Sequence, residues 1–294
     1  IVAEALKDMH KGDGNEFLEK IINVPFVVPY ANKSKIQNIL LDMLNEIQES
    51  QKNHNLNLDH WKYVYKYIVE PNINTLRDVK RILNVFQFYY SSVSDEVDFS
   101  DLFAITILQI TKPNIYYWIL KNKMLLFQHD KNFSLNPNEV ERDRNELIQS
   151  LNSIDSSTDN IEMILACLFP KLGSRIGLVF EGLSDGELRR QCRIGHEDKF
   201  DIYFEFNIQE LEVNNQLVRI ILDEYSMEEI VETLEHRISK KSQKRLLQEM
   251  LARVDVVNDD RANIIIEALL RVKYDMYTDE SESISFSAEI YTDW

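Results

Sequence analysis

The sequence predicts a mainly α-helical fold with little or no β-structure, and three observations support this. Only 7 Gly and 6 Pro occur in 294 residues, too few for the many turns of a β-sandwich or barrel. Apolar residues recur at spacings of three and four through most of the chain, which is the period of one helix face. With 44% hydrophobic and 28% charged residues, the chain has the composition of a folded globular protein with a substantial apolar core.

The first half of the chain is a series of amphipathic segments that we expect to be helices. A helix over residues 1–11 ends at the glycines of GDGN, and Pro25 and Pro29 force an extended backbone soon afterwards. Thr75 and Asp78 have the spacing of a capping box, so one helix should start at Thr75. The other helices of this half are predicted over 34–50, 59–70, 99–111 and 114–127.

The second half begins after a polar stretch, 129–135, that is the best candidate for a boundary between two units. Asn136 and Pro137 open a charged helix that runs to Leu151, and Asp159 is expected to cap the helix IEMILACLF. The region 170–215 gives no clear pattern, although IYFEF alternates as a short strand would. Helices are again predicted near 226–238, 241–253 and 259–275, the first with a capping box of Ser226 and Glu229, before an acidic tail.

Charge and cysteine content limit the classes of function. The formal net charge of −16 disfavours a nucleic-acid surface over most of the chain, because phosphate binding needs Lys and Arg. Cys167 and Cys192 are the only cysteines and form no metal-binding motif, which suits a reducing, cytoplasmic setting. No run of about 18 apolar residues is present, so no membrane segment is expected.

Three cations form the most informative local cluster. If Thr75 caps its helix, Arg77, Lys80 and Arg81 lie on one face of the first turns, at spacings of three and four. Cations together with free backbone N–H groups at a helix start favour an anion such as a phosphate. The alternative is that they pair with some of the many Asp and Glu side chains.

Motifs that would carry chemistry within this chain are absent. There is no GxxxxGK[ST] phosphate-binding loop and no GxSxG elbow, and neither cysteine has a nearby histidine in an arrangement that suggests a nucleophile, so we assign no catalytic residue. The cluster GHEDKFD (His196, Glu197, Asp198, Lys199 and Asp201) could be a metal or nuclease site, or else a capped helix start or a solvated loop. The second interpretation is favoured because no strand pair brackets the cluster. We therefore predict no metal site, and we expect His60 and His236, which lie in helical patterns, to be surface or half-buried residues.

Two segments together resemble the KAP family of P-loop NTPases. The first is VAEAL followed by LEKII (18–22) and VPFVVP (24–29), which is similar to the exit from the family's NTPase core. The second, from Asn74 to Asn84, is similar to its next helix, although Leu76 stands where the family has proline. DLFAITILQITKPNIYYWI resembles the helical pair that follows, and LFPKL and RIGHEDKFDIYFEF resemble a later motif more loosely.

The resemblance implies a division into three parts: 1–29 as the remnant and exit of the NTPase core, 30–130 as a helical lid, and 131–294 as a C-terminal helical domain with an acidic tail. It implies that Arg77, assisted by Lys80 and Arg81, senses the terminal phosphate of a nucleotide. ATP and Mg would be bound by core segments that are expected before Ile1, so this chain alone should be inactive.

We therefore interpret the chain as the C-terminal lid and partner-binding part of a bacterial KAP-type ATPase, for which the resemblance implies a setting in anti-phage defence. A protein partner or self-association is expected. The alternative is a self-contained helical protein-interaction module with no nucleotide role, in which the three cations are ordinary surface ion-pair partners.

Overall fold

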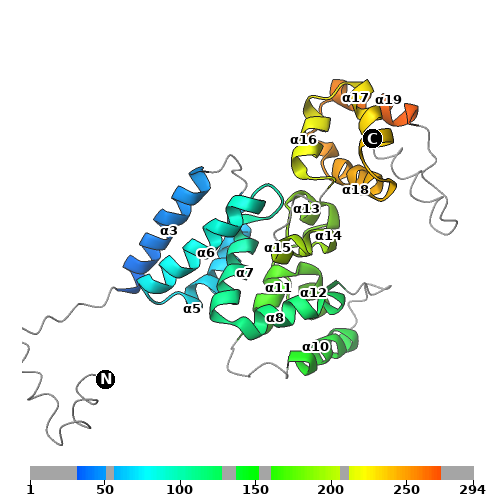
Figure 1. Ribbon diagram of the computed structural model, residues 1–294. Helices are drawn as coiled ribbons and strands as arrows, with labels where there is room; N and C mark the ends of the chain where they lie inside the picture. The colour runs from blue at the N-terminus through cyan, green and yellow to red at the C-terminus, as the bar shows by residue number, and fades with distance from the viewer. Residues whose placement is uncertain (1–31, 51–55, 128–136, 152–159, 206–211, 273–294) are drawn as a thin grey trace, which may run out of the picture.

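The computed structural model describes residues 32–50, 56–127, 137–151, 160–205 and 212–272 (Figure 1). Within these ranges every regular element is a helix and there is no strand, so the prediction of a mainly α fold is confirmed. The α-helices are α3 (Lys33–Ser50), α4 (Leu58–Val64), α5 (Glu70–Asn72), α6 (Leu76–Val93), α7 (Phe99–Thr111), α8 (Pro113–Lys121), α9 (Lys123–Phe127), α10 (Pro137–Leu151), α11 (Ile161–Leu168), α12 (Pro170–Arg175), α13 (Asp185–Arg190), α14 (Glu197–Phe200), α15 (Ile202–Glu205), α16 (Asn215–Asp223), α17 (Met227–Glu232), α18 (Lys240–Leu251) and α19 (Asp259–Arg271). The helices predicted before residue 32 and the acidic tail lie outside the described residues.

Both predicted capping boxes are confirmed. The N–H of Asp78 donates to Thr75 Oγ1 at 3.1 Å, and the N–H of Thr75 donates to the Asp78 carboxylate at 3.0 Å. The Ser226 box starts α17 in the same way. A third box, made by Ser184 and Glu187, starts α13 inside the region 170–215, for which no clear pattern was predicted. Each reciprocal pair satisfies two backbone donors that a helix start otherwise leaves free.

Three details of the predicted helices differ from the structure. Residue Asn160, not Asp159, is the N-cap of α11, and it lies in the left-handed region at φ 74° without a side-chain capping bond. The helix predicted over 114–127 is interrupted at Asn122, whose N–H bonds to Trp118 O and Ile119 O. The first four residues of IYFEF form the short helix α15 (Ile202–Glu205) rather than a strand.

The helix predicted over 59–70 contains a π-helical turn at Tyr65–Val69, between α4 and α5. The N–H of Glu70 bonds back to Tyr65 O, five residues earlier. Pro71 follows directly and has no N–H to donate, so one bond of the helical ladder is missing here, and the ladder resumes at Ile73, whose N–H donates to Val69 O at 3.1 Å.

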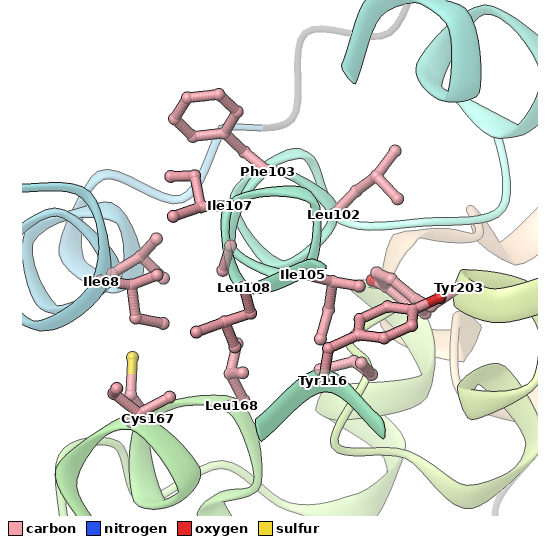
Figure 2. Close-up of a cluster of buried hydrophobic side chains, with 14 of the residues drawn as sticks. Ile68, Leu102, Phe103, Ile105, Ile107, Leu108, Tyr116, Cys167, Leu168 and Tyr203 are labelled. Carbon is pink, nitrogen blue, oxygen red and sulfur yellow. The ribbon is translucent and has the colours of Figure 1, made fainter. Parts of the chain in front are cut away.

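The larger apolar core surrounds α7. All residues from Phe99 to Leu108 are buried, so this helix has no solvent-facing side over most of its length. Figure 2 shows its side chains between Ile68 on one side and Leu168 and Tyr203 on the others. Helices α4, α6, α8 and α11 supply most of the surrounding apolar surface, and the core includes residues before and after 128–136.

A second apolar core lies within α16–α19. It is made by residues such as Val218, Leu246 and Ile265, and it is separate from the first core. Figure 1 shows these four helices as a group beside α13 and α14. We call residues 212–272 the C-terminal unit. Among the described residues, no helix combines the length and apolar character that crossing a membrane requires.

Candidate functional site

The start of α6 presents the predicted cationic cluster to solvent. Arg77, Lys80 and Arg81 are all exposed, while Val79, Ile82 and Leu83 on the opposite face are buried. The buried face fixes the orientation of the helix, so the three cations point outward together. The sequence therefore predicted both the helix start and the face correctly.

These cations have no ion pair or hydrogen bond with any other residue that the structure describes. Asp78, the nearest acid in the sequence, accepts instead from the N–H and hydroxyl of Thr75. Some cations elsewhere are paired, as Lys33 is with Glu70 at 3.2 Å and Lys123 with Asp201 at 2.6 Å, whereas other exposed ones, such as Lys121, have no ion pair with a described residue. Three cations at the positive end of a helix dipole repel one another and the dipole, and a bound anion would reduce this repulsion.

A buried polar network lies against α7, the helix that the first core surrounds, and it was not predicted. His60 on α4 and Asp101 on α7 are joined by a 2.7 Å contact between Nε2 and Oδ1. Arg193 donates from Nε to the other Asp101 oxygen at 2.8 Å and from Nη1 to Glu181 at 3.0 Å. The N–H of Ile194 also donates to Asp101, at 2.9 Å.

The charges of this network determine its pKa shifts. Burial lowers the pKa of His60, but the Asp101 carboxylate and the bond to Glu181 outweigh burial and raise the pKa to about 9. Burial raises the pKa of Asp101, but Arg193 and His60 outweigh it and lower the pKa to about 2. For Asp98, burial and the neighbouring Asp101 charge raise the pKa to about 6. The network is thus anchored by an ionised Asp101 between two cations.

His60, Asp98 and Asp101 also have the composition of a metal site, since one ligand atom from each lies within 4.8 Å of the others. However, Asp101 already accepts three bonds, from His60, Arg193 and Ile194. The Arg193 guanidinium already supplies the positive charge beside Asp101 that a bound metal ion would otherwise supply. The arrangement therefore acts as a structural link among α4, α7 and the segment after α13.

The expectation for His60 was wrong, because this residue is completely buried. Its neighbours in the sequence place it on a helix but give no sign of Asp101, 41 residues later. The expectation for His236 was correct, since its side chain is 73% exposed.

The cluster GHEDKFD is a capped helix start. His196 is the N-cap of α14, and its Nδ1 accepts from the N–H of Asp198 at 3.2 Å. The acids of the cluster point to separate cations, with Asp198 paired to Arg189 and Asp201 to Lys123. Among the described residues, this segment does not gather ligands for a metal ion. The nuclease alternative is therefore not supported.

Comparison with known families gives one match, and it covers the helix with the cationic cluster. Residues 1–93 match the model of the KAP family P-loop domain. This confirms the resemblance over the first third of the chain. The KAP match ends at Val93, the last residue of α6. No curated protein and no solved structure matched the chain.

Proposed function

We propose that this chain is the C-terminal helical lid and partner-binding part of a KAP-type P-loop ATPase, and that it senses bound nucleotide through Arg77, with Lys80 and Arg81 beside it. The observation that carries the proposal is that α6, which presents these cations, lies inside the KAP match. The lid would comprise residues 30–130, after an exit from the NTPase core over 1–29, and the C-terminal domain residues 131–294.

An exposed guanidinium at a helix start suits contact with a terminal phosphate. Charge-assisted hydrogen bonds from Arg to phosphate contribute about 1.5–3 kcal/mol each. A contact of that size, made only when nucleotide is bound, shifts a two-state balance by one to two decades. The chain has no GxxxxGK[ST] loop, so ATP and Mg would be held by core segments and Arg77 would contribute only at the phosphate end.

A continuous path connects α6 to the C-terminal unit. The helix ends at Val93, and three residues later the carboxylate of Glu96 accepts from the backbone N–H of Asn215, at the start of α16. A displacement of α6 would therefore act directly on the residues that hold the C-terminal unit. This supports transmission of nucleotide state to a partner protein. The anti-phage setting is what the family resemblance implies, and the cytoplasmic location is what the low cysteine content favours.

The test is the rate of ATP hydrolysis by a protein in which this chain accompanies its phosphate-binding core. We expect Arg77→Ala to lower the turnover rate by about tenfold or more, as loss of a charged transition-state or sensor contact does. Arg271→Ala is the matched control, because Arg271 is an exposed helical arginine outside the KAP match. Equal turnover in the two variants would remove the sensor role and favour an interaction module without nucleotide.

A further inference from the structure

The C-terminal unit meets the rest of the molecule through charged and polar side chains rather than through a shared apolar core. The two apolar clusters are separate, one over residues 36–203 and the other over residues 213–272. Helix α18 of the C-terminal unit packs against α13, as Figure 1 also shows. We call the contact between the C-terminal unit and the rest of the molecule the junction.

Glu249, on α18, is the centre of the junction and is 1% exposed. Its carboxylate lies 3.0 Å from Lys199 Nζ and 3.3 Å from Arg189 Nη1, both in the first group of helices. Arg253, within the C-terminal unit, approaches the same carboxylate at 2.6 Å. Three cations thus converge on one buried anion, two of them from the other side of the junction.

Asn215 makes a second set of bonds across the junction. Its backbone N–H donates to Glu96, and its side-chain amide donates to the carbonyl of Asp95. The amide oxygen of Asn215 accepts from Arg253 at 2.7 Å, so both sets belong to one network.

The junction contains most of the unsatisfied buried polar atoms found among the described residues. Four such atoms have no hydrogen bond, and three of them belong to Glu96 and Arg245; the Glu96 atom, Oε2, lies 3.5 Å from Lys199 Nζ as a longer ion pair. Arg245 lies one helical turn before Glu249 and lowers the pKa of Glu96 by its charge, yet the two groups share no hydrogen bond. A pocket of about 230 Å³ also lies here, lined by residues of both sides such as Tyr90, Arg190 and Val257.

These features indicate a contact that can open. A permanent apolar interface has few unsatisfied polar atoms and little empty space. Buried ion pairs add little net stability, because desolvation cancels much of the attraction, and on separation the charges regain water. We propose that the C-terminal unit docks reversibly on the rest of the chain, held by an electrostatic latch that Glu249 closes with Lys199 and Arg189.

The test measures the distance between two spin labels, one on each side of the junction, by pulsed electron paramagnetic resonance on the 294-residue chain. Gln87→Cys on α6 and Glu228→Cys on α17 provide exposed labelling positions, and both natural cysteines are buried. In the otherwise unaltered chain at about 0.1 M salt we expect one narrow distance distribution. Glu249→Gln should raise the ratio of undocked to docked molecules by about 100-fold, because it removes the buried anion that Lys199 and Arg189 share with Arg253.

The matched control is Glu232→Gln, which makes the same charge change in the C-terminal unit at an exposed pair with Arg237. This control should keep the narrow distribution. If Glu249→Gln loses the helical circular dichroism signal, Asn215→Ala replaces it, with an expected shift of about tenfold from the loss of its cross-junction bonds. A narrow, unshifted distribution in the folded test variant would show that the junction is permanent and would overturn the proposal.

Discussion

Asp101 and Arg193 form an ion pair in which neither side chain is exposed, with Arg193 Nε 2.8 Å from Asp101 Oδ2. The two residues are 92 positions apart in the sequence. The pair fixes the segment after α13 to the central helix α7, and His60 extends the link to α4. Because every oxygen of Asp101 is occupied, the network resembles a buried structural triad more than a site open to ligands.

Removal of Arg193 should destabilise the chain strongly. In Arg193→Met, Asp101 and Glu181 lose their shared cation while remaining in place, so we expect the free energy of unfolding to fall by about 3–5 kcal/mol. Urea unfolding followed by circular dichroism measures this change. The double variant Arg193→Met/Asp101→Asn should recover part of the loss, since the unpaired charge is removed as well.

The control for this variant is Lys62→Met, which breaks the exposed pair between Lys62 and Asp59. Its unfolding midpoint should match that of the unaltered chain, because exposed pairs contribute little. Equal midpoints for Arg193→Met and Lys62→Met would contradict the role we assign to the buried network.

The stability of the chain should decrease as the pH rises through the titration of His60. The folded-state pKa is raised from 6.5 to about 9, so the folded chain binds the proton more tightly than the unfolded chain. The contribution of protonated His60 to the free energy of unfolding is complete below pH 6.5 and is lost as the pH approaches about 9. By linkage the loss is on the order of 3 kcal/mol.

Urea unfolding at intervals across this pH range tests the prediction, with His60→Gln as the comparison. The variant has no group that titrates at this position, so its unfolding free energy should vary less over the same range. Parallel curves for the two chains would show that His60 is neutral in the folded state and that the pH dependence arises elsewhere.

Helix starts could be predicted from the sequence, whereas the buried charges could not. The capping boxes at Thr75 and Ser226 depend on residues three positions apart, so local chemistry is sufficient. The partners of His60 and Lys199 come from distant segments, and a sequence pattern does not show which charges the fold brings together. Arg193 and Lys199 stand in a polar stretch of the sequence, and that local pattern does not show that both are buried. The cationic face of α6 could be predicted because it depends only on helical spacing.

Two helical glycines should respond in opposite ways to replacement by alanine. A Cβ on Gly173 would lie 2.5 Å from the carbonyl oxygen of Leu178, a backbone atom that cannot move aside easily. Gly173→Ala should therefore destabilise the chain by about 1–3 kcal/mol. Nothing lies within 4 Å of a Cβ on Gly186, in α13. Gly186→Ala should stabilise the chain by about 0.5–1 kcal/mol, because alanine favours a helix.

Thermal unfolding of both glycine variants checks the pair together. We expect the highest melting temperature for Gly186→Ala, an intermediate one for the unaltered chain and the lowest for Gly173→Ala. A Gly173→Ala chain that melts at or above the temperature of the unaltered chain would mean that the turn between α12 and Leu178 adjusts without cost.

The capping box at Thr75 should link stability to the position of the cations on α6. Thr75→Ala removes the hydroxyl that accepts from the N–H of Asp78, so we expect the free energy of unfolding to fall by about 1 kcal/mol. Thr75→Ser keeps an acceptor at the same place and should lose much less stability.

Fraying of the first turn of α6 would also loosen Arg77, which lies only two residues after the cap. In a protein with its ATPase core, Thr75→Ala should therefore lower turnover in the same direction as Arg77→Ala but to a smaller extent, and Thr75→Ser should not. If Thr75→Ala and Thr75→Ser unfold at the same urea concentration, the side-chain cap does not stabilise α6.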